Sequence, residues 1–513
     1  SGPDPAMLSR PSSSDSLPRR GADLLRPSGF ARRVRAQQDC APTFASWVRP
    51  GAVLLALLLP SLVLAGPLAE LRSDRPLADR IALIDRFVDE HYYDPAGLMY
   101  SHIKWDEERP FTPADFGPGD STMAGPEPHA WMSYENSPFI AGLFLAAQSY
   151  RYEATRDPAA LASARRAFGA VDGVYRLNEA PAADTGPVQK AGIIEVAVRG
   201  AGPGGGFFGK PYYGHATDHT STEQHFGPLL GLYRYWRIAP PETQARIREI
   251  FSAVSRRWRA GYRINYFGET WNLEESYPRA QRHMFLWAVM HRLAYEVTRE
   301  PECLAEFRRL DALYGALPTP RETMFGLGRP SYISTEDRQF HVQMVIGAEL
   351  LSELEPAARE RYERGLLAWW AYSQTGQRDD LTAYYFIKID TLTGAWEKLP
   401  LSIKDRAHWR SPFLLHNATL PIAWVGIRER QSLTGTIVAR HAPPAVAAAA
   451  RARVAAIFNG LDKEHLKWFM DPEGVMPPPT RWMLNVLQGD ALAFYSLGYW
   501  YARAHGIDPA APL

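Results

Sequence analysis

Acidic and aromatic side chains gather in a few segments of this 513-residue chain, and their types suit chemistry on a sugar. Hydrolysis of a glycosidic bond needs a carboxylic acid to protonate the leaving oxygen, and usually a second carboxylate as base or nucleophile. Five carboxyl groups in these segments are candidates: Glu135, Asp218, Glu223, Glu274 and Asp337. Asp218 leads, because it precedes a histidine and lies two residues before a predicted helix in the most polar segment.

These carboxyl groups also have structural interpretations. Glu223 lies three residues after Thr220, and Asp337 lies three residues after Ser334, which is the spacing of a capping box. For the other glutamates, exposure on a loop is the simpler explanation, since acidic residues are mostly exposed. The sequence leaves the catalytic and the structural interpretations open.

The same segments could instead support β-elimination at a uronic acid. A polysaccharide lyase removes the proton beside the uronate carboxylate with a Tyr or His base, while Asn, His or Arg neutralises that carboxylate. The residues that fit are Tyr134, Asn136, His219, His225, Arg338, His341, His416 and Asn417. Each histidine also has a simpler interpretation as a hydrogen-bonded residue near the core.

Aromatic, amide and basic side chains of these segments are predicted to bind the substrate. A sugar ring offers one apolar face for stacking and many hydroxyls for polar groups. Arginine can bind a uronate carboxylate through two parallel hydrogen bonds. The predicted substrate-binding residues are Trp131, Asn136, His225, Trp271, Glu274, Arg279, Arg338, His341, His416 and Asn417.

Two other site types are not expected. Gly204 to Lys210 matches the start of a phosphate-binding loop, but Pro211 stands where the magnesium-binding Ser or Thr should be. The two cysteines, Cys40 and Cys303, cannot build a cysteine-based metal site. No cofactor is therefore predicted, although a divalent metal held by His and Asp from separate segments is left open.

Composition and charge narrow the classes of partner. The chain is 46% hydrophobic, which is typical of a folded globular protein. Its 57 Lys and Arg residues nearly balance 56 Asp and Glu residues. A net charge of +1 gives no field that would attract nucleic acid or an anionic membrane, so a polysaccharide or oligosaccharide is the expected partner. The oligomeric state is not predicted.

The N-terminal segment is typical of an export signal. Residues 1–6 precede the first methionine, Met7, and are interpreted as a cloning remnant. A long basic region then leads to the apolar run Gly51 to Ala65, which is shorter than the ~20 residues of a spanning helix and is interrupted by Pro60. Residues 7–65 are therefore predicted to be a signal peptide, and the protein to be secreted or periplasmic. An uncleaved anchor is the alternative, but no stable membrane span is expected.

Residues 66–513 are predicted to form one helical domain. Amphipathic periodicity and Pro or Gly breaks predict about a dozen helices. These cover 76–92, 136–155, 158–177, 221–237, 241–262, 280–299, 301–315, 335–353, 356–374, 411–429, 443–459 and 483–505.

The connections between these helices alternate between short and long. Tight turns end at Pro158, Pro241, Pro301 and Pro356, and proline at a helix start costs no helical hydrogen bond. Such turns predict antiparallel hairpins. Long connections cover 93–135, 178–220, 263–279, 316–334 and 375–410. A ring of hairpins would put all long connections, and hence a site, on one rim. A weak repeat of about 115 residues relates the helix starts near Thr220 and Ser334, and it fits such a ring. Residues 183–217 could add a small β-hairpin.

Two segments carry a resemblance to a known group. Ser133 to Leu143 (SYENSPFIAGL) and Asp218 to His225 (DHTSTEQH), with the hairpin rhythm, resemble the six-hairpin, (α/α)6-toroid carbohydrate-active enzymes, especially those that process uronic acids. The resemblance covers about residues 76–505. It implies an all-α toroid. Toroid lyases often carry an additional β-sandwich, for which the sequence after Arg481 offers no room, and this favours a hydrolase.

The sequence thus predicts an exported glycoside hydrolase that cleaves a uronic-acid-containing polysaccharide or oligosaccharide by carboxylate acid/base catalysis. A polysaccharide lyase with a Tyr or His base is the first alternative. A non-catalytic glycan-binding protein of the cell envelope is the second. The site is expected where the loops before residues 136, 221, 280, 335 and 411 converge.

Overall fold

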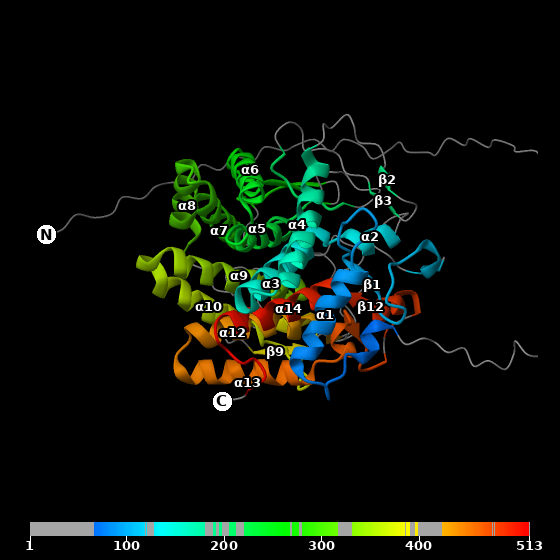
Figure 1. Cartoon of the computed structure of the whole chain (residues 1–513). Helices are drawn as coiled ribbons and strands as arrows, with labels where there is room; N and C mark the ends of the chain where they lie inside the picture. Colours follow the sequence, from blue (N-terminus) through cyan, green and yellow to red (C-terminus); the bar gives the residue numbers. More distant parts are fainter. Residues whose placement is uncertain are drawn as a thin grey trace, which may run out of the picture. The chain divides into compact units, whose positions relative to one another are not determined.

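The computed structural model describes most of the chain after residue 65 (Figure 1). The described residues are 66–117, 120, 128–179, 188–190, 194–196, 205–211, 220–266, 269–275, 280–315, 331–384, 386–389, 395–398, 423–474, 476 and 478–511. The predicted cloning remnant and signal peptide lie outside them. None of the described helices is long and apolar enough to cross a membrane.

Six helices of the described chain form an inner ring. They are α3 (Ser137–Thr155), α5 (Glu223–Trp236), α7 (Ala280–Thr298), α9 (Thr335–Leu354), α12 (Gly426–His441) and α14 (Gly489–Ala504). Each packs against the next in this order, and α14 packs back against α3, so the ring closes. In α3, α12 and α14 nearly every residue is buried, because these helices have neighbours on all sides.

A second layer of six helices covers this ring. Its members are α4 (Pro158–Glu179), α6 (Pro241–Arg259), α8 (Pro301–Tyr314), α10 (Arg359–Ser373), α13 (Pro444–Gly460) and α1 (Leu77–His91). The first five each pack against the inner helix that precedes them in the chain. The sixth hairpin joins the two ends of the domain, because α1 packs against α14. The described helices therefore form an (α/α)6 toroid, as predicted.

Proline defines the short turns of the hairpins. Pro158, Pro241, Pro301 and Pro444 each begin an outer helix, and the 3-10 turn Pro356–Ala358 precedes α10. Proline fits the first helical position because its missing N–H would have no partner there. A short turn leads from each of the first five inner helices to its outer partner. Hydrogen bonds and ion pairs between the starts of neighbouring inner helices show that these helices run in the same direction. Their N-termini share the rim opposite the short turns.

The segment before α12 differs from the prediction. Instead of one helix over 411–429, β10 (Ala423–Trp424) is followed by α12 from Gly426 to His441, and residues 411–422 lie outside the described part. The helix predicted from residue 483 begins only at Gly489, after the 3-10 helix Pro478–Asn485 and β12 (Val486–Gln488). α12 lacks a one-sided apolar pattern because its charged residues are buried with the rest, so periodicity could not locate it.

Short strands lie in the connections between the hairpins. The predicted β-hairpin is present, with β2 (Val188–Lys190) antiparallel to β3 (Ile194–Val196). Further antiparallel pairing joins β1 (His102–Lys104) to β12, β4 (Arg263–Tyr266) to β5 (Glu269–Asn272), β6 (Ser331–Ser334) to β8 (Phe386–Ile389), β8 to β9 (Trp396–Lys398), and β10 to both β7 (Ala383–Tyr384) and β11 (Phe469–Met470). The described connections are thus more structured than the single predicted hairpin. A short helix, α2 (Pro128–Tyr134), precedes α3.

Glycines bring two inner helices into backbone contact. A Cβ atom added to Gly142 of α3 would lie 2.2 Å from the backbone of Gly227 in α5, and one added to Gly231 would lie 2.2 Å from the Gly142 carbonyl oxygen. These distances leave no room for a methyl group, and backbone atoms cannot move aside as a flexible side chain can. The close packing of α3 on α5 therefore requires glycine here.

Gly142→Ala is expected to lower the free energy of unfolding by at least about 1–3 kcal/mol, because α3 and α5 must separate to admit the methyl group. Gly169→Ala on α4 is the matched control. Its Cβ would meet nothing within 4 Å, so it should raise stability by about 0.5–1 kcal/mol through helix propensity. Urea denaturation of both variants measures the difference; equal stability of the two would contradict the close contact.

Candidate active site

Polar side chains crowd the rim where the N-termini of the inner helices meet. Every inner helix contributes at least one within its first two turns or just before them. The members with described side chains are Glu135, Asn136, Thr222, Glu223, Gln224, Arg282, His283, His341, Glu429, Arg430 and Asp490. The N-terminal ends of helices carry partial positive charge and favour carboxylates, which fits the four acidic residues in this set.

Two carboxylates lie at the adjacent starts of α3 and α5. The residues that directly follow them in the chain are joined, because Gln224 Nε2 donates to Asn136 Oδ1 over 2.8 Å. Glu135 forms an ion pair with Lys210. Glu223 is partly exposed and forms no hydrogen bond or ion pair with any residue of the described structure. The two groups therefore have different environments although they are neighbours.

The predicted capping box at α5 is wrong. Helix α5 begins at Glu223, so its N-cap is Thr222, whose side chain makes no capping bond. Thr220 instead donates its hydroxyl hydrogen to the Phe208 carbonyl over 2.6 Å. The carboxylate of Glu223 thus has no capping role, so a capping box does not explain why this residue is acidic.

A buried ion cluster links α12 to α14. The Arg430 guanidinium lies 2.8 Å from Glu429 Oε1 and 2.5 Å from Asp490 Oδ2, and all three side chains are buried. Burial raises the pKa of both carboxyl groups, while Arg430 opposes the rise. Glu135 and Glu223 also raise the pKa of Asp490, so all these acids belong to one electrostatic neighbourhood.

His102 lies beside this cluster. Its ring stacks on Trp468 with 4.8 Å between centroids, and the side chain is buried. Burial, followed by the charges of Arg430 and Lys210, lowers the pKa of His102 to about 3. The imidazole is therefore neutral at neutral pH. Neither ring nitrogen has a hydrogen-bond partner in the part of the chain that the structure describes.

Further contacts connect the remaining inner helices. Thr222 Oγ1 and His283 Nδ1 are 2.7 Å apart, which joins α5 to α7. The Arg282 guanidinium lies 4.0 Å from the centre of the Phe340 ring, which joins α7 to α9. His341 Nε2 lies 3.4 Å from Thr434 Oγ1 of α12. Together with the α3–α5 and α12–α14 links, these contacts follow the rim around the ring.

His225 lies in the core, as the simpler interpretation of the histidines had it. Its Nδ1 donates to the Ser221 carbonyl over 3.2 Å, and its Nε2 accepts the Phe208 N–H over 3.1 Å. Burial lowers its pKa to about 3, and Trp258 and Trp287 pack against the ring. His225 therefore holds the segment that carries Lys210 and uses both ring nitrogens within the protein.

Tyr134 does not fit the role of a lyase base. Its hydroxyl donates to Asp94 Oδ2 over 2.7 Å, and the side chain is buried. Burial first, and then the charge of Asp94, raise the pKa of Tyr134 well above its usual range. A hydroxyl held in this way is a poor proton acceptor. Trp131, four residues before Glu135 on α2, is also buried.

Two predicted substrate-binding residues lie outside the inner ring. Glu274 Oε1 is 3.1 Å from Arg309, on the outer helix α8. Trp271 lies in β5 and is partly buried. The ion pair with α8 explains Glu274 structurally.

The structure does not describe the side chains of seven predicted site residues. Asp218, His219, Arg279, His416 and Asn417 lie outside the described residues, and Asp337 and Arg338 belong to α9 with side chains outside them. Their predicted roles remain predictions. Among the described residues, no group of three His, Cys, Asp or Glu side chains is arranged to hold a metal ion.

The sequence reasoning missed several members of the rim, namely His102, Lys210, His283, Glu429, Arg430 and Asp490. Lys210 appeared only as part of a rejected phosphate loop. Asp490 stands alone before a long apolar run, and an acid at the start of an otherwise buried helix is a signal that could have identified it. Glu429 is the last residue of the helix predicted over 411–429 and Arg430 follows it, whereas both lie near the start of α12.

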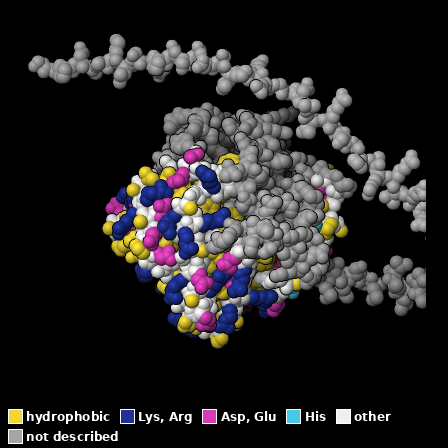
Figure 2. Space-filling model, turned by 90° about the horizontal axis from the view of Figure 1, so that it is seen from above, with side chains coloured by type: hydrophobic (Ala, Val, Ile, Leu, Met, Phe, Trp, Pro, Cys, Tyr) yellow, Lys and Arg dark blue, Asp and Glu magenta, His cyan; other side chains and the backbone are white. Residues whose placement is uncertain are grey.

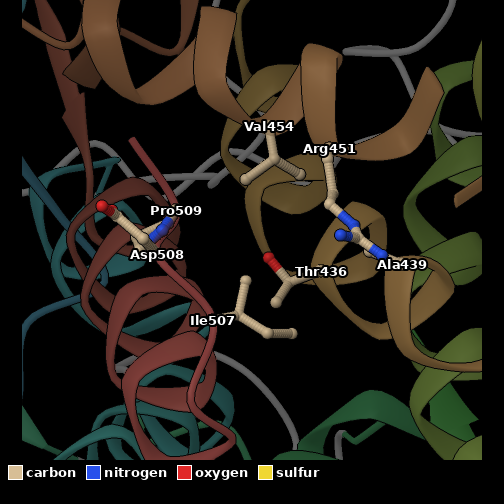
Figure 3. A pocket seen from close by; sticks show the side chains of 7 residues that line it. All are labelled: Thr436, Ala439, Arg451, Val454, Ile507, Asp508 and Pro509. Carbon is tan, nitrogen blue, oxygen red and sulfur yellow. The ribbon is translucent and has the colours of Figure 1, made fainter. Parts of the chain in front are cut away.

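Away from the rim, the surface offers no comparable site in the described part. A cavity of about 10 Å³, roughly the space of one water molecule, lies in the C-terminal half of α12 between Thr436, Arg451 and Ile507 (Figure 3). It is too small for a sugar. On the face drawn in Figure 2, basic and acidic side chains of the described residues are interspersed, with no basic patch of the kind that nucleic acid needs.

The helix order, the closed ring and the polar rim define the class of this chain as an (α/α)6 toroid with a candidate site at the inner-helix N-termini. No known protein family and no curated protein matches the sequence.

Three similar solved structures have titles that name enzymes acting on sugars. D-mannose isomerase has a TM-score of 0.47 and 10% identity over 84% of this chain and 97% of its own. Cellobiose 2-epimerase from Bacillus thermoamylovorans has a TM-score of 0.46 and 9% identity, over 83% of this chain and 99% of its own. Unsaturated glucuronyl hydrolase specific for heparin has a TM-score of 0.30 and 10% identity, over 73% of this chain and 100% of its own. These likenesses are too weak to assign an activity, and the toroid follows from the helix contacts themselves.

His225→Gln should change how stability depends on pH. The depressed pKa of His225 means that its contribution is complete above the unfolded value of 6.5 and is lost as the pH falls toward about 3. The wild type should therefore lose free energy of unfolding relative to His225→Gln as the pH is lowered, by about 1.4 kcal/mol for each pH unit between about 6 and about 4.

Denaturant unfolding at several pH values measures this difference. The exposed His91, changed to Gln, is the control. Parallel pH profiles for the wild type and His225→Gln would show that burial does not hold His225 neutral.

Proposed function

We propose that this chain is a carbohydrate-processing enzyme of the glycoside hydrolase type, with Glu223 as general acid and Glu135 as the second carboxylate. The observation that carries the proposal is the Asn136–Gln224 hydrogen bond of 2.8 Å, which joins the helix starts at which both carboxylates lie. Hydrolysis of a glycosidic bond needs two such groups in different protonation states.

The environments of the two carboxylates support different roles. The ion pair of Glu135 with Lys210 suits a base or nucleophile at the anomeric carbon. Glu223 has no hydrogen bond or ion pair within the described structure and is partly exposed, which suits the general acid at the leaving glycosidic oxygen. A water molecule then completes the reaction by adding to the anomeric carbon.

Export is part of the proposal. Residues 7–65 have the basic region and short apolar run of a signal peptide, and the enzyme would act on a polysaccharide or oligosaccharide in the periplasm or outside the cell.

A second candidate function is proton transfer at a sugar carbon, as in isomerisation or epimerisation. The observation that favours it is His102, a neutral histidine beside the ion cluster with both ring nitrogens unpartnered. A neutral imidazole can remove a proton next to a carbonyl group. β-Elimination at a uronate would need a different base from Tyr134.

Product analysis on a panel of oligosaccharides tests these functions. Hydrolysis yields a new reducing end, elimination yields an unsaturated uronate that absorbs in the ultraviolet, and isomerisation changes the sugar without cleavage. We expect new reducing ends, and a loss of about 10²–10⁴-fold in rate for Glu223→Gln and for Glu135→Gln.

Glu302→Gln is the matched control, because Glu302 is an exposed carboxylate in the first turn of the outer helix α8. Its activity should equal that of the wild type. Full activity of Glu223→Gln would refute the assignment of the acid. Asp218→Asn in the same assay tests the leading candidate of the sequence.

A further inference from the structure

A group of buried polar atoms at the rim has no hydrogen-bond partner among the described residues. They are Nδ1 and Nε2 of His102, Oε1 of Gln224, Oε2 of Glu429, Oε1 of Gln488 and Oδ1 of Asp490. All five side chains are at most 3% exposed. Buried polar groups are normally hydrogen-bonded, since an unmade bond costs free energy. Other buried polar atoms of the described structure are also unpartnered, but these five side chains lie beside the two proposed catalytic carboxylates, where a ligand could supply the missing hydrogen bonds.

These side chains form one continuous group. His102 and Gln488 face each other as paired residues of β1 and β12. Gln488 Nε2 lies 3.3 Å from Asp490 Oδ2, and Arg430 connects Asp490 to Glu429. Gln224 joins the group from α5, where it is bonded to Asn136 beside Glu135. The group therefore borders both proposed catalytic carboxylates.

The chemistry of these atoms selects the ligand. The unpartnered oxygens of Gln224, Gln488 and Asp490 accept hydrogen bonds. Burial raises the pKa of Glu429 to about 8, so its carboxyl group can donate one. A neutral His102 ring offers one donor and one acceptor, so acceptors outnumber donors. A sugar hydroxyl can donate as well as accept, whereas a uronate carboxylate can only accept. Lys210 and Arg430, the nearby cations, already form ion pairs with carboxylates of the same group.

We infer that this group of side chains is a subsite for a neutral sugar ring and disfavours a uronic acid at that position. The inference rests on the proposed carbohydrate function and names its substrate class. It departs from the uronic-acid substrate that the sequence resemblance implies. The hydroxyls of the ring would donate to the amide and carboxylate oxygens, and His102 would bond one hydroxyl from its place on Trp468.

Matched pairs of sugars test the preference directly. Glucose and glucuronate, galactose and galacturonate, and mannose and mannuronate differ only at C6. Calorimetric titration of the full chain carrying Glu223→Gln separates binding from turnover. At least one neutral sugar is expected to bind, and its uronate to bind at least about tenfold more weakly, because the acceptors would repel it. Equal or tighter uronate binding overturns the inference, and so does binding of neither member of any pair.

His102→Phe tests the role of the unpartnered nitrogens. Phenylalanine keeps an aromatic ring on Trp468 but offers no hydrogen bond, so folding should be preserved. Affinity for the neutral sugar should fall by about five- to tenfold, while the unfolding temperature of the free protein should not fall. His91→Phe on the exposed face of α1 is the control and should leave binding unchanged. Unchanged affinity of His102→Phe would remove His102 from the subsite.

The two proposals can fail separately. Neutral-sugar binding without hydrolysis by the wild type would refute the hydrolase but keep the subsite. Hydrolysis with a preference for uronates would keep the hydrolase and refute the subsite.

Discussion

The common direction of the six inner helices is the constraint on which the site depends. Short turns lead from five of the inner helices to their outer partners, and contacts between helix starts show that the inner helices enter the ring from the same side. Their N-termini therefore share one rim, where unbonded backbone N–H groups and partial positive charges accumulate. Carboxylates are favoured in that environment, and Glu135, Glu223, Glu429 and Asp490 lie there. A ring of helices in alternating directions would have dispersed these groups over two rims.

Closure of the ring depends on contacts between segments far apart in the sequence. The first helix, α1, covers the last, α14, and α14 packs against α3. Strand β1 pairs with β12 just before α14 and brings His102 beside Gln488. On the other side of α3, Gly142 meets α5 without any side chain between the backbones. These contacts bring residues from both ends of the domain into one polar group.

The rim combines satisfied and unsatisfied polar groups, and the difference separates structural from functional residues. His225 uses both ring nitrogens within the protein and holds the segment of Lys210. The Tyr134 hydroxyl likewise donates its hydrogen bond within the protein, to Asp94. Glu223 and His102 have no such partners. Under the proposed function, Glu223 and His102 are the groups that would meet the substrate, because no described residue of the protein satisfies them.

Local patterns in the sequence determined the helical hairpins, the proline turns and the rim on which a site would lie, because amphipathic period and proline position act within a few residues. They also pointed to Glu135 and Glu223. They could not locate α12 or the start of α14, whose burial on all sides removes any one-sided pattern. Only the tertiary structure decided that Arg430 meets Asp490, that Lys210 meets Glu135, and that His225 belongs to the core. Those contacts span 60, 75 and 17 residues, and no local period can encode which distant side chain completes a hydrogen bond.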